Sequence, residues 1–385
     1  MVVHERGEWL AESLQGLAGQ NYNALQSLVL VTGVEDDPVS REILDVVATN
    51  LPMAVVRFLG GNPGFGAACN SVLNLVDGNS GLFCFLHDDV ALAPDAISRL
   101  VEELYRSNAG AVGPKLVYWD DPRMIQSVGI AVDRFGNSLP IADDGELDQE
   151  QHDAVQDVFI VSSACIMVRA DLFSTINGFN PDLPGAGADL DLCWRLHATA
   201  ARVMVVPSAI GRHRENSSQS VNNSDGADHF LDNEIVRVRT VASLTSAQQL
   251  LTTVLQMGIL TIARFFLLLA TGRVRRAIDE MRALLLLPFG VVEIRERREA
   301  MSVHRAVSGV EVRALQLPGN AYLANFLRRR AAQAGQAQAQ SAGQTQEATP
   351  RSAYVLWGML VAIFLVGSRA LFLDGIAPVG QMAPI

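Results

Sequence analysis

The stretch from residue 61 to residue 89 constrains the fold of this chain more than any other part of it. It opens with a turn rich in glycine and asparagine, Gly61-Asn62-Pro63-Gly64. Residues 81–86 form an apolar run typical of a buried strand, and His87-Asp88-Asp89 follows directly. A glycine-rich turn, then a buried strand that ends in acids, indicates an α/β fold with a ligand site at the carboxyl edge of its sheet.

The chemistry of this stretch favours a diphosphate ligand. Glycine has no Cβ, so backbone N–H groups of residues 61–66 can approach a phosphate or a sugar closely. The paired carboxylate oxygens of Asp88 and Asp89 suit Mg²⁺ or Mn²⁺ that carries a diphosphate. Together the two features suggest a site for a nucleotide-sugar.

Simpler interpretations stay open for each half of the motif. The glycines would also serve a tight connection between helix and strand, and Asp88 and Asp89 would also cap a helix that starts near Ala93. A Rossmann dehydrogenase has a glycine loop with an acid about 20 residues later. The spacing Gly64-x-Gly66-x-x-Cys69, placed after the third strand-like segment, argues against that alternative.

The segment from Gly187 to Arg195 decides between these alternatives. Its sequence places Asp189 and Asp191 near the start of an expected helix. The positive end of a helix dipole favours ionised carboxylates. An ionised carboxylate that faces a cleft can deprotonate an acceptor hydroxyl group.

At this point the chain resembles the family 2 inverting glycosyltransferases, especially their actinobacterial rhamnosyl- and galactofuranosyl-transferase-like branch. The resemblance covers about residues 1–215 and rests on four elements in family order. These are the Asn-x-Gly-Phe segment from Asn62 to Asn70, the acid motif at His87–Asp89, the acidic helix at Ala188–Arg195 and the late His213.

The resemblance implies a GT-A-type nucleotide-diphospho-sugar transferase fold, a Rossmann-like mixed and mainly parallel sheet followed by membrane-associated helices. It implies Mg²⁺ or Mn²⁺ as the cofactor. The implied metal ligands are Asp89, Asp88 and His213, and the implied donor-binding residues are Thr32, Asn62, Gly64, Gly66, Asn70 and Asp88. The implied catalytic residues are Asp189 as the base and Asp191, with Trp194 and Arg195 at the acceptor.

Three residues depart from the family pattern. Ala188 stands where the family has a glutamate before the catalytic aspartate, and His87 stands at the first acid of the metal motif. The second strand ends in Thr32 instead of an aspartate that touches the base. These positions bear on acceptor geometry, on the metal ligands and on recognition of the base.

Helix and strand patterns alternate along the first third of the chain. The expected helices are 8–19, 38–50, 63–76 and 94–106, and the expected strands are 26–32, 53–59 and 81–87. This order predicts a parallel sheet with helices on both faces. Farther along, 158–161 and 164–168 are expected as buried strands. We interpret the acidic loop 141–157 as a solvated insertion rather than an acceptor-side one, and 216–228 as a lid or a linker.

Charge and hydrophobicity divide the chain. Residues 1–247 carry a net charge of −18, which argues against a nucleic-acid partner. Residues 273–330 hold 12 arginines and six acids, which fits a surface of anionic lipid. The hydrophobic content of 49% also indicates membrane contact. Without a visible signal peptide, the four cysteines are expected to be reduced thiols of a cytoplasmic domain.

Two apolar stretches follow the catalytic region. Residues 354–373 supply the roughly 20 residues that a membrane span needs. Basic residues 328–330 precede it and place its N-terminal side in the cytoplasm. A span at 250–272 would put the arginines of 273–330 outside, so we expect 250–272 and 284–292 to be interfacial helices. A second true span is the alternative.

The sequence therefore predicts a catalytic domain at 1–230, interfacial helices at 231–330, a low-complexity linker at 331–349 and a transmembrane helix within 350–385. The predicted function is transfer of a sugar from a nucleotide-diphosphate donor to a lipid-linked or envelope glycan at the cytoplasmic membrane face. The alternative is a catalytically degenerate binding module at the membrane. The chain stops twelve residues after Leu373, so we expect it to be a piece of a longer polytopic membrane protein.

Overall fold

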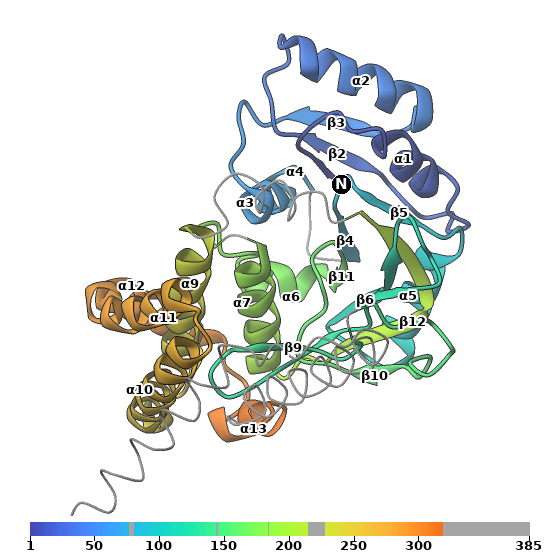
Figure 1. The fold of residues 1–385 in the computed structure, drawn as a ribbon. Coiled ribbons are helices and arrows are strands. Elements are labelled where there is room, and N and C mark those ends of the chain that lie inside the picture. The colour runs from blue at the N-terminus through green and yellow to red at the C-terminus, as the bar shows by residue number, and fades with distance from the viewer. Residues whose placement is uncertain (77–80, 144, 184, 215–227, 319–385) are drawn as a thin grey trace, which may run out of the picture.

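A computed structural model describes residues 1–76, 81–143, 145–183, 185–214 and 228–318 (Figure 1). The predicted linker at 331–349, the predicted span at 354–373 and residues 216–227 lie outside the described residues. The described part is a three-layered α/β unit with a group of helices packed against one side.

The N-terminal unit is a small parallel sheet covered by two helices. Strands β1 (Val2–Val3), β2 (Leu28–Val31) and β3 (Val55–Phe58) pair in that order, with α1 (Leu10–Ala18) and α2 (Pro38–Asn50) beside them. Helix α2 has the expected bounds because Asp37 caps its first turn and Pro38 fits its first position. The ends of β1 and β2 carry His4 and Thr32.

The second sheet is larger and mixed. Its order is β10-β12-β6-β11-β4, with β5 added to β12 and β7 added to β6. The bounds are β4 (Leu82–Leu86), β5 (Val90–Leu92), β6 (Ala111–Tyr118), β7 (Ile125–Ser127), β10 (Gln156–Asp157), β11 (Cys165–Arg169) and β12 (Val203–His213). A parallel bridge between Val2 and His87 places β1 beside the end of β4. A separate hairpin joins β8 (Ile130–Val132) and β9 (Ser138–Pro140).

Two sequence expectations about the sheet are wrong. Among these strands only β1–β2, β2–β3 and β6–β12 pair in parallel, so the sheet is not mainly parallel. Strand β11 runs antiparallel to both β4 and β6. Residues 158–161 are buried but do not form a strand, because they connect β10 to β11 with a single bridge at Ile160.

Helices cover both faces of the large sheet. Helix α5 (Ala96–Arg106) packs with the apolar side chains of one face. On the other face lie α3 (Phe65–Asn70), α6 (Ala170–Thr175) and α7 (Gly185–Ala198). The expected helix 63–76 is split at Ser71 into α3 and the short α4 (Val72–Leu75).

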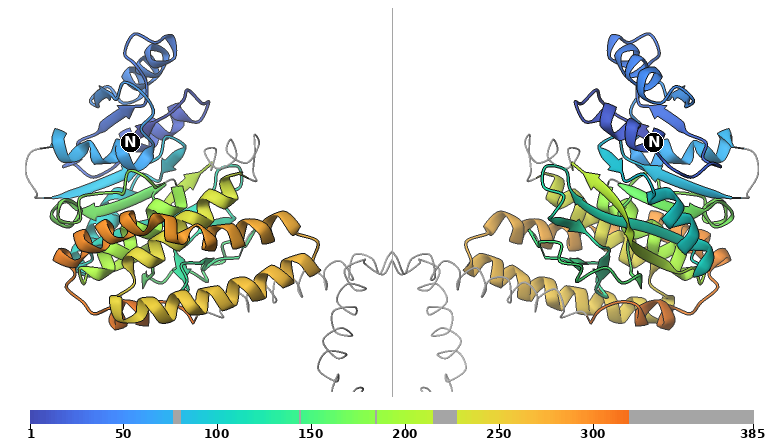
Figure 2. Two further views of the ribbon diagram at one scale, coloured as in Figure 1. Left: turned by 90° about the vertical axis from the view of Figure 1, so that its left-hand side faces the viewer. Right: turned by 90° about the vertical axis from the view of Figure 1, so that its right-hand side faces the viewer.

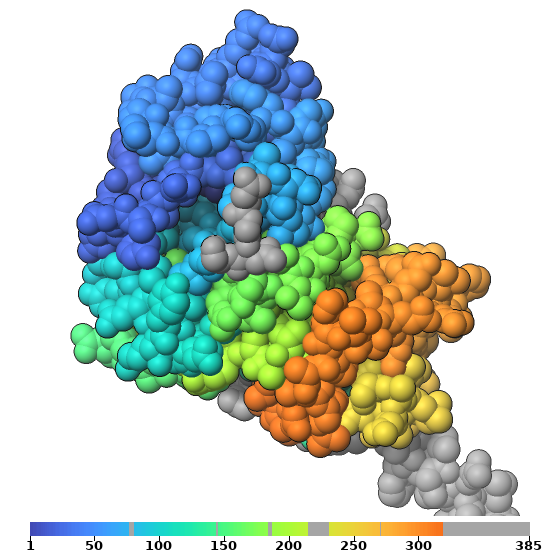
Figure 3. Space-filling model, turned by 180° about the vertical axis from the view of Figure 1, so that it is seen from behind, coloured from blue at the N-terminus to red at the C-terminus, as the bar shows by residue number. Residues whose placement is uncertain are grey.

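The helices after residue 228 share the core of the α/β unit. They are α9 (Asp228–Leu244), α10 (Ala247–Ala270), α11 (Val274–Leu285), a 3₁₀ turn η1 (Leu287–Gly290), α12 (Val291–His304) and α13 (Gly309–Ala314). Val238, Val241 and Met301 pack in one apolar cluster with Leu190 and Trp194 of α7. In Figure 3 the orange surface of the last helices lies directly against the green surface of this unit.

Helix α10 combines an exposed apolar face with an inward-facing arginine. Figure 2 shows it projecting to one side of the sheet. Its exposed large apolar side chains are Leu251, Leu255, Ile259, Ile262 and Phe266, and two glutamines, Gln248 and Gln256, are exposed beside them. Its only charged residue, Arg264, donates to Glu280 of α11 over 2.7 Å and to Asn137 over 3.3 Å. Within the described residues, α10 alone is long and apolar enough to cross a membrane, with a mean hydropathy of 1.7.

Candidate functional site

The ends of two strands bring a carboxylate and an imidazole together. Asp89 lies in the turn between β4 and β5, and His213 is the last residue of β12. Strand β5 runs antiparallel to β12 so that Val90 pairs with His213. The backbone N–H of Arg214 also donates to the carbonyl of Asp89 over 3.1 Å. Residues 124 positions apart in sequence are thereby held side by side.

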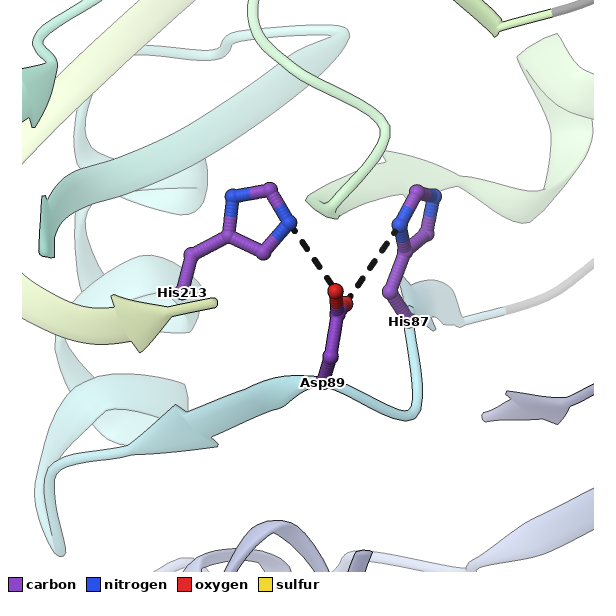
Figure 4. A group of neighbouring side chains, drawn as sticks. All are labelled: His87, Asp89 and His213. Carbon is purple, nitrogen blue, oxygen red and sulfur yellow. Dashed lines mark ion pairs between the residues drawn. The ribbon is translucent and has the colours of Figure 1, made fainter. Parts of the chain in front are cut away.

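His87, Asp89 and His213 form a compact cluster of potential metal ligands. Asp89 Oδ1 lies 3.5 Å from His213 Nε2 and 3.8 Å from His87 Nδ1. Figure 4 shows the two imidazoles on either side of the Asp89 carboxylate. One donor atom from each residue lies within 4.8 Å of the other two. The predicted ligands Asp89 and His213 are therefore brought together, and His87 joins them.

The cluster fits a divalent cation. Burial lowers the pKa of His87 to about 3, with a further contribution from His213, so its imidazole is neutral near pH 7. His213 Nε2 is buried and has no hydrogen-bond partner. A neutral imidazole offers a lone pair, and a carboxylate offers an anionic oxygen. These three residues would hold the metal through two nitrogens and one oxygen.

Asp88 contacts the N-terminal unit and is not part of this cluster. Its Oδ2 accepts a hydrogen bond from the backbone N–H of His4 over 2.8 Å. His4 Nδ1 lies 3.2 Å from the hydroxyl of Thr32. Burial raises the pKa of Asp88 to about 7. Asp88, His4 and Thr32 therefore form a second polar group at the strand ends, and the role of Asp88 as a metal ligand has no geometric support.

The glycine turn leads into α3 in a conformation that only glycine adopts easily. Gly64 has φ of +85°, and a Cβ built there would meet nothing within 4 Å. Asn62 Oδ1 accepts from the backbone N–H of Gly64 over 3.0 Å and fixes the turn. The backbone at Gly64 is thus exposed to any ligand at this edge.

Gly66 and Asn70 have structural contacts instead. A Cβ at Gly66 would lie 3.0 Å from Phe179 Cβ, so glycine allows α3 to pack closely there. The Asn70 side chain donates to the carbonyl of Phe179 over 2.7 Å and accepts from its backbone N–H over 2.8 Å. The amide nitrogen and the amide oxygen of Asn70 therefore each make a hydrogen bond within the fold. Direct donor contacts by these two residues remain predictions.

Asp189 is a buried carboxylate near the start of α7. Its side chain is 8% exposed, and Oδ2 accepts from the backbone N–H of Ser163 over 3.1 Å. Its Oδ1 has no hydrogen-bond partner. Burial raises the pKa of Asp189 to about 6, so it is largely ionised at neutral pH. This carboxylate is suited to accept a proton.

One loop connects Asp189 to the metal cluster. Ser163 binds Asp189, and the next residue, Ala164, accepts a hydrogen bond at its carbonyl from the backbone N–H of His87 over 3.0 Å. The predicted base and the metal cluster are therefore neighbours in the fold.

The other predicted residues of α7 are engaged inside the protein. Arg195 donates through Nε to Asp191 over 2.7 Å and through Nη1 to the carbonyls of Ile176 and Gly178, each over 2.8 Å. Trp194 is 3% exposed, and its ring contacts Phe159 edge-on. These contacts assign structural roles to Asp191, Trp194 and Arg195. They do not support the predicted catalytic or acceptor contacts.

Two polar residues near the site carried no signal in the sequence. His4 follows a strand of only two residues, and Gln126 belongs to the three-residue strand β7. Gln126 Oε1 lies 2.7 Å from His213 Nδ1. His4 and Gln126 are positioned by residues that are distant in the sequence, so no local motif indicates their role.

Residues 1–176 match the protein-family model described as "Glycosyl transferase family 2". This part, slightly less than half of the chain, is therefore similar to family 2 glycosyltransferases, and the match bears out the predicted enzyme class, a glycosyltransferase.

Curated relatives match a similar part of the chain. The O-antigen biosynthesis protein RfbC of Myxococcus xanthus is 27% identical over 159 residues, 39% of this chain and 12% of that protein. The uncharacterized protein y4gI of Sinorhizobium fredii (strain NBRC 101917 / NGR234) is 30% identical over 148 residues, 36% of this chain and 16% of that protein. The matched regions are thus a small part of both relatives.

Two solved structures are similar to part of the chain. A crystal structure of GalNAc-T7 with UDP, GalNAc and Mn²⁺ has a TM-score of 0.45 and 10% identity, over 55% of this chain and 42% of that one. The crystal structure of S. aureus TarS has a TM-score of 0.40 and 16% identity, over 63% and 42% of the two chains.

Proposed function

We propose that this chain, whose residues 1–176 match the glycosyltransferase family 2 model, is an inverting, metal-dependent glycosyltransferase. It transfers a sugar from a nucleotide-diphosphate donor to a lipid-linked or cell-envelope glycan acceptor. The observation that carries the proposal is the His87–Asp89–His213 cluster, which lies at the strand ends one loop away from the buried carboxylate of Asp189.

The donor would lie between the glycine turn and the metal cluster. A divalent cation held by these residues would supply positive charge to stabilise the departing diphosphate. Gly64 leaves its backbone open to the phosphates. The group of Thr32, His4 and Asp88 lies at the ends of β1, β2 and β4, where it would face the nucleoside.

The ligand atoms of the cluster favour Mn²⁺ over Mg²⁺. Mg²⁺ is a hard cation that prefers oxygen ligands and octahedral geometry. Two of the three ligands here are imidazoles, which suit transition metals better. The substitution of His87 for the first acid of the motif would thus change the choice of metal.

Asp189 would act as the general base. Its carboxylate takes the proton of the acceptor hydroxyl while the acceptor oxygen bonds to the anomeric carbon from the face opposite the leaving group. The bond from that carbon to the diphosphate oxygen breaks, and the diphosphate leaves with both electrons. A single displacement of this kind inverts the configuration at the anomeric carbon.

We further propose that the enzyme works on the cytoplasmic face of the membrane. The exposed face of α10 and the exposed apolar residues Leu285, Leu286 and Phe289 would lie at the lipid interface. Exposed arginines 273, 275, 276 and 282 follow α10 in sequence and would attract anionic lipids. Arg264 is bonded to Glu280 and Asn137, which favours an α10 that stays docked on the protein rather than one that spans the bilayer.

Donor hydrolysis tests the proposal. The protein is incubated with a panel of UDP- and dTDP-sugars, with and without Mn²⁺, and the released nucleotide is measured. Slow Mn²⁺-dependent hydrolysis of at least one donor, lost in Asp89→Ala, supports the enzyme. No hydrolysis of any donor would favour the alternative, a binding module in which buried Ala188 marks a lost acid.

A further inference from the structure

The two ring nitrogens of His213 face different parts of the site. Nε2 lies towards Asp89, whereas Nδ1 lies 2.7 Å from Gln126 Oε1. A side-chain amide oxygen can only accept a hydrogen bond, so this contact keeps the proton on Nδ1. The Nε2 lone pair then remains available to a metal.

We propose that Gln126 is a positioning residue that fixes the tautomer and the ring orientation of His213 for metal binding. The inference rests on the metal site of the proposed function and adds to it a residue outside the four motif elements. Partners of this kind orient metal-bound histidines, and their loss typically weakens metal binding by about 10–100-fold.

A β-bulge explains why Gln126 reaches His213. Strand β7 pairs with β6 through Leu116 with Ser127 and Val117 with Ile125, so the register shifts at Gln126. The extra residue of a bulge leaves the ladder, and its side chain takes a new direction. On its other side β6 pairs with β12, where Tyr118 stands opposite His213. The bulge and the metal ligand therefore flank the end of the same strand.

The loop expected to be a solvated insertion holds β7 in place. The backbone N–H of Ile125 donates to the carbonyl of Glu146 over 2.8 Å. Lys115, the single lysine of the chain, is 3% exposed and donates to Asp148 over 2.7 Å and to Asp153 over 2.6 Å. The acidic loop is thereby anchored to β6, and it braces the strand that carries Gln126.

Calorimetry with Mn²⁺ alone tests the proposal on the full chain and three variants. Gln126→Leu removes the acceptor, Gln126→Glu keeps an acceptor for the Nδ1 proton, and Ser127→Ala is a control on the same strand. We expect Gln126→Leu to bind Mn²⁺ about 10–100-fold more weakly. Gln126→Glu should match or exceed the wild-type affinity, and Ser127→Ala should leave it unchanged.

Thermal unfolding without metal separates positioning from folding. Equal midpoints for wild type and Gln126→Leu, with weaker Mn²⁺ binding, support the proposal. Wild-type Mn²⁺ affinity in Gln126→Leu overturns the positioning role alone. The positioning role is also overturned if the Leu and Glu variants lose Mn²⁺ affinity to the same extent and also lower the unfolding midpoint to the same extent, because a purely structural role gives that result. If the wild type binds no Mn²⁺, the metal site itself fails and this inference fails with it.

Discussion

Asp189 and His87 are fixed to consecutive residues of one loop. Ser163 donates its backbone N–H to Asp189 over 3.1 Å, and Ala164 accepts from the backbone N–H of His87 over 3.0 Å. The proposed base and one imidazole of the metal cluster therefore share a rigid support at the sheet edge. A fixed distance between the base and the cation that binds the leaving group lowers the activation barrier, because the reacting groups are already in position.

Replacement of Asp189 should separate binding from chemistry. Asp189→Asn keeps the shape of the side chain but removes the proton acceptor, so turnover should fall about 10²–10⁴-fold while donor affinity is retained. Steady-state kinetics and donor calorimetry measure the two effects. Asp191→Asn is the comparison, and we expect it mainly to lower the thermal midpoint, because Asp191 is paired with Arg195. A larger loss of turnover in Asp191→Asn than in Asp189→Asn would show that the two roles are reversed.

The raised pKa of Asp189 gives opposite pH dependences for activity and stability. Turnover should increase through about pH 6, where burial places the pKa of this carboxyl, because only the ionised form accepts a proton. The folded-state pKa lies above the ordinary value of 3.8, so the stability contributed by the protonated form is lost as pH rises from about 4 to 6.

From the raised pKa of Asp189 we also predict how Asp189→Asn changes the free energy of unfolding. At pH 8 the buried charge costs up to about 3 kcal/mol, at about 1.4 kcal/mol for each pKa unit. Asp189→Asn should therefore raise the free energy of unfolding in urea at pH 8, and much less at pH 4. Equal effects at the two pH values would contradict the assigned burial of the charge.

Exchange of His87 should alter the preference of the cluster for its metal. His87→Asp replaces a nitrogen ligand with a hard oxygen. The ratio of Mn²⁺ affinity to Mg²⁺ affinity should therefore fall by about tenfold or more. Competition calorimetry with the two ions measures the ratio. His304→Asp, on the exposed surface of α12, controls for added charge. An unchanged ratio in His87→Asp would exclude His87 as a ligand.

The exposed face of α10 predicts reversible lipid binding. Leu255→Glu and Ile259→Glu place charge on this face and should reduce sedimentation with anionic vesicles, whereas Met53→Glu on the N-terminal unit should not. High salt should release the wild type, because each arginine near the surface contributes about 1 kcal/mol of attraction. Protection of residues 250–272 from protease in vesicles that resist salt and carbonate would instead show a second span.

Local signals in the sequence were sufficient to predict several of the helices and strands and part of the site. Helix α2 has its predicted bounds because Asp37 and Pro38 specify its start. The strand before His87 ends within one residue of its prediction, which placed Asp89 at the sheet edge. Such elements depend on residues that lie close together in the chain.

Features that depend on distant partners could not be predicted in the same way. Local patterning does not distinguish a parallel β11 from the antiparallel one, because the direction follows from its pairing with β4 and β6. Trp194 resembles an exposed acceptor contact in the sequence, but α7 is buried between the sheet and α9. Gln126 becomes a neighbour of His213 through a register shift that only the paired strands create.

Calorimetry of donor binding with and without Mn²⁺ tests the central claim most directly. The claim is that the cluster around Asp89 binds a cation that carries the donor diphosphate. Wild-type protein should bind a UDP- or dTDP-sugar much more tightly with Mn²⁺ than without it. Asp89→Ala should lose that Mn²⁺-dependent gain and keep the wild-type circular dichroism spectrum. Donor affinity that does not depend on Mn²⁺, or that is unchanged in Asp89→Ala, would contradict the account.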